Sequence, residues 1–260
     1  ITRMVGLFAK LEGLPSARFS TACYTNLHMA ASLHGLELDT DINDTSMWCG
    51  NASKFEDVRT QIVAAFVAGR IAFEMVFHAY EVLGQSYCNK TRSVTTQQIT
   101  RKLMSDETYR PLIGFDEVAS AAIARLPFEF DSKTPDAELA ISFSSRIGLG
   151  AECIRQFRNA LVHGRLQAHD PIDWHEGNDP GTTLQVKLFR SQIRLCLLLI
   201  QTIVERILGD EEVEDSSFEV FSVRDIVACL HSQDKLFDDE DDPDQPVFAG
   251  FRSAPRFHYW

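Results

Sequence analysis

The chain has 260 residues, of which 45% are hydrophobic and 24% charged, so it is long and apolar enough to bury a substantial core. Its formal net charge of −12 argues against a general nucleic-acid-binding protein, whose surface is basic. No CxxC pair or zinc-like spacing occurs among the six cysteines, which indicates reduced thiols and a cytoplasmic location.

Residues 1–50 show no sustained hydrophobic period, and we expect an irregular N-terminal segment there. The strongest helical pattern follows over 53–88, where Ser53 and Glu56 form a capping-box pattern. Its apolar residues cover more than one face, which predicts a helix at the centre of a bundle. Shorter helices are expected over 95–106, 115–126 and 136–147, punctuated by prolines.

A helix over about 149–163 carries the most informative segment, and a polar loop over 167–183 separates it from a helix over about 187–208. That last helix contains the run LCLLLI (195–200), which is far shorter than the roughly 20 residues of a membrane span. An acidic extension over 210–260 has one short helix at 223–230 and ends in an aromatic tail. The predicted class is therefore all-α, in three parts: 1–50, 51–209 and 210–260.

The segment IRQFRNALVHG (154–164) combines two arginines, an amide and a histidine on an amphipathic helix. At about 100° per residue, Ile154, Phe157 and Leu161 share an apolar face. The polar side chains share one contiguous arc, namely Arg155, Arg158, Asn159 and His163. Gly164 is the expected helix stop. A guanidinium holds a phosphate through two parallel hydrogen bonds, and an imidazole moves a proton near neutral pH.

The string Arg158-Asn159, three residues, then His163-Gly164 resembles the signature motif of the HEPN superfamily (higher eukaryotes and prokaryotes nucleotide-binding). The resemblance covers this helix directly and the helical pattern of 53–209 more loosely. It implies a helical domain that dimerises so that two motifs face each other. It also implies a metal-independent endoribonuclease, of the kind found among toxins and anti-phage effectors, with Arg158, Asn159 and His163 as catalytic residues.

The interpretation as a ribonuclease predicts RNA as substrate, Arg155 and Arg165 as substrate-binding residues, and neither metal nor cofactor. It further predicts a homodimer with the LCLLLI helix at its interface, and an antitoxin or an upstream sensor domain as partner, without membrane association. Two alternatives remain open: an inactive helical domain that binds nucleotides or scaffolds a partner, and an acidic regulatory partner of a toxin. Arg158 could also simply pair with a carboxylate, for which Glu74 and Glu81 are the candidates.

Three further patterns in the sequence contain side chains of functional type. Glu74, His78 and Glu81 have helical spacing suited to a metal, but the Glu-x-x-His order of di-iron bundles is reversed and occurs once. The loop that follows the motif contains several ligand-type side chains without a recognised spacing, so a solvated acidic loop is expected there. The GLG string at 148–150 lacks the lysine of a phosphate-binding loop.

Overall fold

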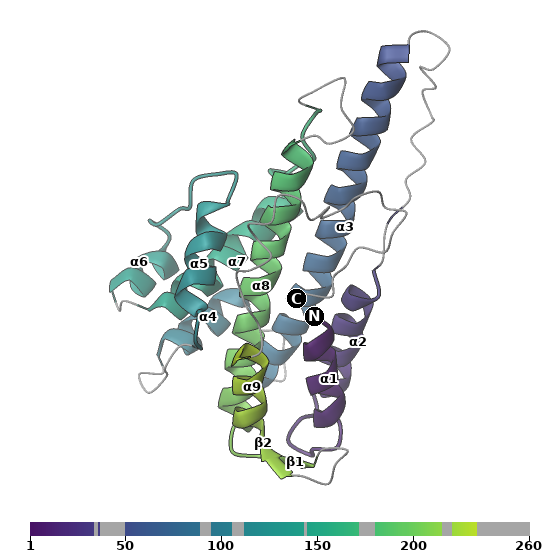
Figure 1. Ribbon diagram of the computed structural model, residues 1–260. Helices are drawn as coiled ribbons and strands as arrows, with labels where there is room; N and C mark the ends of the chain where they lie inside the picture. The colour runs from purple at the N-terminus through teal and green to yellow at the C-terminus, as the bar shows by residue number, and fades with distance from the viewer. Residues whose placement is uncertain are drawn as a thin grey trace.

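Two long parallel helices, α3 (Gly50–Tyr87) and α8 (Pro180–Leu208), form the centre of the fold in the computed structural model (Figure 1). The structure describes residues 1–33, 36, 50–88, 95–105, 112–142, 145–171, 180–214 and 220–232. The Phe66 ring lies 5.5 Å from that of Phe189, and at the other end Arg206 donates to the Tyr87 hydroxyl at 2.6 Å. Because these pairs advance together along both helices, α3 and α8 run in the same direction.

Smaller helices cover the two sides of this pair. On one side of α3 lie α1 (Thr2–Leu11) and α2 (Ser20–Ala31), as Figure 1 shows. The other side carries a group of four helices, namely α4 (Thr96–Met104), α5 (Phe115–Ala124), α6 (Pro135–Ser142) and α7 (Arg146–Val162). A two-stranded antiparallel sheet, β1 (Glu212–Glu214) and β2 (Val220–Ser222), leads into α9 (Val223–Ser232). The all-α class is thus confirmed for the part of the chain that the structure describes.

The expectation of an irregular N-terminal segment was wrong for residues 2–11 and 20–31, which are helical. In α1, Phe8 and Leu11 are fully buried, and Leu27 of α2 is fully buried as well. Both helices belong to the same hydrophobic core as α3 and α8. Their stability comes from packing, since short helices are marginal alone: α2 lies against α3, and α1 lies against α2. Residues 37–49 lie outside the described residues.

The hydrophobic core also continues past residue 210, where the sequence predicted the end of the helical bundle. Val213 of β1 is 6% exposed, and Val223 and Val227 are fully buried against the rest of the protein. The described part of the predicted extension therefore packs as part of the bundle. The acidic run at 238–244 and the aromatic tail lie outside the described residues.

Two details of the central helices also differ from expectation. Helix α3 begins at Gly50, so Ser53 lies inside α3 and does not cap it. The LCLLLI run is buried within its own chain, because none of residues 195–200 exceeds 5% exposure. That run is consequently unavailable as a dimer interface, because the hydrophobic residues that suggested an interface form the core of the bundle.

One described stretch, Ser53–Tyr87, is long and apolar enough by composition to cross a membrane. Within its most apolar window, however, 61% of the residues are buried inside the protein. The central helix of a soluble bundle has the same composition, because other helices surround it on several sides. The burial is consistent with a soluble protein.

Candidate functional site

The helix that carries the Arg-Asn-x3-His segment is α7, and its C-terminus has a fixed geometry. His163 is the C-cap residue, and Gly164 follows with φ +67°, a left-handed conformation suited to glycine. The Arg165 N–H donates to the Ala160 carbonyl at 2.8 Å, and the Gly164 N–H donates to the Leu161 carbonyl at 3.3 Å. This pair of bonds is the Schellman motif. The predicted helix stop at Gly164 is confirmed, and the turn carries Arg165 back along the helix.

The apolar face of α7 fixes how the helix is rotated in the bundle. Ile154, Phe157 and Leu161 are at most 1% exposed, as their spacing predicted. The Phe157 ring lies 4.8 Å from that of Phe73 on α3 and 5.6 Å from that of Phe189 on α8, both edge-on. Aromatic pairs at this distance and angle favour one relative orientation. Arg158, the next residue, is therefore held beside α3.

The guanidinium of Arg158 lies over the ring of Phe77, 5.7 Å from its centroid. Its Nε atom is buried and has no hydrogen-bond partner, and among the described residues Arg158 forms no ion pair. Burial raises the pKa of Glu81, and the nearby positive charge of Arg158 opposes that rise. Arg158 thus lies close enough to Glu81 to influence it electrostatically, but the expected alternative of an Arg158–Glu ion pair is absent from the described residues.

His163 lies on a different side of the helix end. Its backbone N–H donates to the Asn159 carbonyl at 3.0 Å, and its side chain is exposed to solvent. Arg158 lies against α3, over the ring of Phe77, whereas the side chain of His163 is exposed at the end of α7.

Three other residues that the sequence singled out line a common cavity of about 520 Å³, which we call the α7 pocket. These are Arg155, Asn159 and Arg165. The opposite wall belongs to the connection between α5 and α6 and includes Phe128 and Glu129. The remaining residues around the pocket are Pro127, Asp131, Thr134, Gln156, Ala160, Leu166 and Gln167. Arg158 and His163 are not among them.

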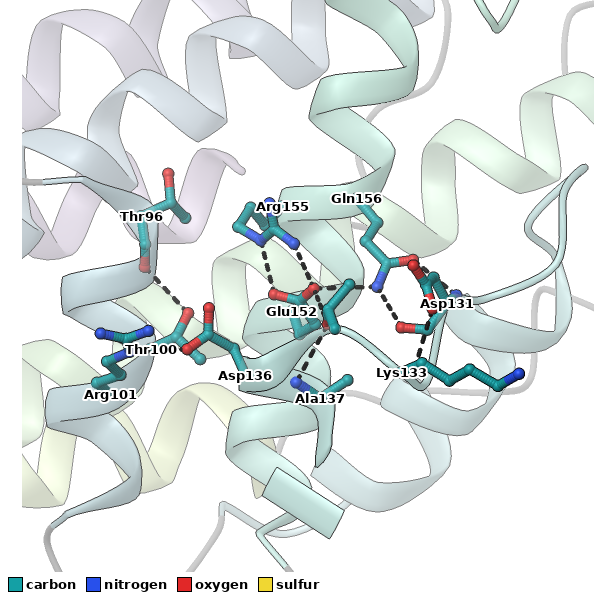
Figure 2. A network of polar contacts seen from close by, with 11 residues as sticks. Thr96, Thr100, Arg101, Asp131, Lys133, Asp136, Ala137, Glu152, Arg155 and Gln156 are labelled. Carbon is teal, nitrogen blue, oxygen red and sulfur yellow. Dashed lines mark hydrogen bonds and ion pairs between the residues drawn. The ribbon is translucent and has the colours of Figure 1, made fainter. Parts of the chain in front are cut away.

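Arg155 is already paired inside the protein. Its Nε and Nη2 atoms donate to the two carboxylate oxygens of Glu152 at 2.7 and 2.5 Å, and Glu152 is fully buried (Figure 2). The hydrogen bonds to Glu152, together with the negative charge of that carboxylate, raise the pKa of Arg155. The predicted substrate-binding role of Arg155 stays a prediction, but most of its charge is balanced by Glu152 before any ligand binds.

The Glu152 carboxylate is the centre of a network that joins α7 to the connection between α5 and α6, as Figure 2 shows. Thr134 Oγ1 donates to Glu152 Oε1 at 2.8 Å, and Gln156 Nε2 donates to the same oxygen at 3.0 Å. Gln156 also bonds both backbone groups of Asp131, at 2.9 and 3.0 Å. These bonds hold the wall of the α7 pocket in place.

The suggested metal site on α3 has little support from the geometry. His78 Nδ1 lies 3.7 Å from Glu81 Oε2, and the His78 side chain is 62% exposed. Within the described ranges no three residues of ligand type come together. In the polar loop, His169 Nδ1 lies 2.8 Å from the Asp170 carbonyl, and residues 172–179 lie outside the described part.

Sequence reasoning missed Glu152, Thr134 and Glu129 as neighbours of the motif. The i, i+3 spacing of Glu152 and Arg155 could have predicted their ion pair. Thr134 and Glu129 come from an earlier part of the chain, and only the packing of α5 and α6 on α7 brings them next to the motif.

Comparisons of the chain with protein-family models, curated proteins and solved structures give no match.

Proposed function

We propose that this chain is a metal-independent endoribonuclease of the HEPN type, with a composite active site that two copies of α7 form in a homodimer. The observation that carries the proposal is that neither Arg158 nor His163 forms an ion pair among the described residues, so both side chains can still contact a substrate. Arg158 has a buried Nε without a partner and forms no ion pair among the described residues. His163, on the following turn, has an exposed imidazole.

In the proposed reaction an imidazole of His163 takes the proton of a ribose 2′-hydroxyl, and that oxygen attacks the adjacent phosphorus. The O2′–P bond forms and the P–O5′ bond breaks. The second imidazole of the dimer protonates the leaving 5′ oxygen, so the products are a 2′,3′-cyclic phosphate and a 5′-hydroxyl. Arg158 stabilises the phosphorane, which carries more negative charge than the substrate, and Asn159 orients the phosphate or His163.

A dimer through the end of α7 agrees with the exposed apolar residues there. Val162, directly before His163, is 45% exposed, and Leu184 on α8 is 66% exposed. Cys153 bonds Gln192 while Phe157 packs on Phe189, so α7 and α8 run antiparallel and these two exposed residues lie at the same end. Such a surface replaces the buried LCLLLI run as the proposed interface.

The biological setting belongs to the same proposal. Resemblance to HEPN toxins and anti-phage effectors favours a cytoplasmic protein that acts on RNA and is controlled by an antitoxin or an upstream sensor domain. No membrane association and no cofactor are part of it. The net charge of −12 does not prevent RNA contact, since a local basic patch is sufficient for a short strand.

The test is cleavage of a mixed RNA pool in EDTA. We expect His163→Ala and Arg158→Ala to reduce cleavage by at least about 10²-fold, because general acid–base and charge stabilisation each contribute that much. His28→Ala, at an exposed histidine on α2, is the matched control and should cleave normally. Circular dichroism checks that each variant is folded.

A mixing experiment tests the composite site. When Arg158→Ala and His163→Ala chains are unfolded together and refolded, mixed dimers hold one intact arginine and one intact histidine. Cleavage above the level of either variant alone is expected, because only the mixed dimer holds both groups. It should stay well below the wild type, because one of the two imidazoles of the proposed reaction is missing. If the wild type leaves RNA intact while the dimer persists, the chain is an inactive scaffold or nucleotide-binding domain instead.

A further inference from the structure

The α7 pocket has two walls of opposite charge. Asn159 and Arg165, from the end of α7 and the turn after it, provide an amide and a cation. The facing connection between α5 and α6 provides the carboxylate of Glu129 and the ring of Phe128. A cavity of about 520 Å³ lies within the range of small-ligand sites. The pocket therefore suits a ligand that is anionic at one end and rich in N–H donors at the other.

The cationic wall has one charge that is free to act. Arg155 is balanced by buried Glu152, but Arg165 is exposed and forms no ion pair among the described residues. The Schellman turn fixes the Arg165 backbone through its N–H bond to Ala160. The Asn159 side-chain amide likewise makes no hydrogen bond within the described chain. A phosphate is the natural partner for such an arginine.

The acidic wall has a free carboxylate on a rigid support. Asp131 is partly engaged, since its Oδ1 accepts the Lys133 N–H at 3.0 Å and Gln156 bonds its backbone. Glu129 is exposed and has no hydrogen bond or ion pair within the described chain, so both of its oxygens are available. Phe128, beside it, is half-buried and lines the same pocket. Aromatic rings of this kind stack on unpaired bases.

We propose that the α7 pocket binds a guanine base of single-stranded RNA, in the nucleotide beside the scissile phosphate. Guanine alone among the four bases presents two adjacent N–H donors, N1–H and N2–H, on its pairing edge, and they match the two oxygens of one carboxylate. Glu129 accepts both, Phe128 stacks on the base, and Arg165 contacts its phosphate. This assignment rests on the proposed ribonuclease function for its substrate, single-stranded RNA, and adds a preference for guanine.

The position of the pocket relative to the proposed catalytic residue supports this assignment. Asn159 lines the pocket, and its backbone carbonyl accepts the N–H of His163 at 3.0 Å. The two residues are thus neighbours one turn apart at the end of the same helix. A nucleotide in the pocket would place its own phosphate toward the end of α7 that carries the imidazole.

The test measures binding of the four nucleoside 5′-monophosphates to the full-length His163→Ala chain by NMR titration or calorimetry. We expect GMP to bind about tenfold more tightly than AMP, CMP or UMP. Glu129→Gln should remove this preference, while Glu138→Gln, at an exposed glutamate of α6 outside the pocket, should keep it. Arg165→Ala should weaken all four nucleotides alike, because its contact is to the phosphate.

Equal affinity for the four nucleotides, or a GMP preference that survives Glu129→Gln, would overturn the guanine assignment. Binding requires no turnover, so the two proposals fail separately. A wild type that leaves RNA intact but binds GMP through Glu129 would refute the ribonuclease and keep the guanine pocket. Cleavage in EDTA that shows no preference for sites next to guanine would refute the pocket and keep the ribonuclease.

Discussion

Replacing the buried Glu152 by glutamine tests the network that fixes α7. The carboxylate accepts two bonds from Arg155, one from Thr134 and one from Gln156, at 2.5–3.0 Å. A glutamine keeps the shape but removes the charge, and its NH2 group then faces the donors of Arg155. Removing one partner of a buried ion pair costs about 3–5 kcal/mol. Because the Arg155 side chain is 19% exposed, we expect the lower end, about 3 kcal/mol.

Urea unfolding followed by circular dichroism measures this cost. With a urea dependence of about 3 kcal/mol per molar for a chain of this size, the midpoint should fall by about 1 M. Glu138→Gln removes an exposed carboxylate from α6 and should change stability by less than about 0.5 kcal/mol. Adding Arg155→Gln to Glu152→Gln should recover part of the loss, since no unpaired charge then remains. A loss below about 1 kcal/mol for Glu152→Gln would refute the reasoning.

Three further changes have definite expected outcomes. Gly150→Ala should lower stability in urea by about 1–3 kcal/mol, since the new Cβ would lie 2.9 Å from Phe115 Cζ. Gly164→Ala should cost about 1 kcal/mol, entirely from its φ of +67°, because nothing lies within 4 Å of its Cβ position. Cys153 should resist iodoacetamide at pH 8 in the folded protein and react in urea, since burial raises its pKa to about 12.

A control variant and contradicting results can be named for these predictions. Gly6→Ala, in α1, meets nothing within 4 Å and should stabilise the helix by up to about 1 kcal/mol, which separates steric cost from helix propensity. A Gly150→Ala variant as stable as the wild type would contradict the close packing of Phe115 against Gly150. Labelling of Cys153 at the same rate with and without urea would show that this thiol is accessible.

The helices from α3 to α8 could be predicted because their signals are local. Each has an apolar period, and Pro111, Pro127 and Pro135 separate the shorter ones. The stop at Gly164 was equally local. The missed helix α1 also had a readable pattern, since Met4, Leu7, Phe8 and Leu11 follow i, i+3, i+4, i+7 spacing and are all buried. In α2, by contrast, Cys23 and Ala30 contribute to the buried face, and such small residues give a weak periodic signal.

The interior of the candidate site was less predictable, because its contacts join distant parts of the chain. The arc that holds Arg155, Arg158, Asn159 and His163 follows from helical geometry alone. Its division into one residue beside α3, two that line a pocket and one exposed to solvent does not, since it depends on what packs against each side. The same limit applies to LCLLLI, whose hydrophobicity indicates burial but not whether a neighbouring helix or a second chain provides it.

The rotation of α7 agrees with the proposal that two chains share one active site. At about 100° per residue, Arg158 and His163 are about 140° apart around the helix. Phe157 fixes that helix between Phe73 and Phe189, which holds Arg158 against α3 and leaves the end of α7 exposed. In the composite site that we propose, a partner approaches the exposed end of α7, where Val162 is accessible, and brings its own arginine to the phosphate that this imidazole contacts.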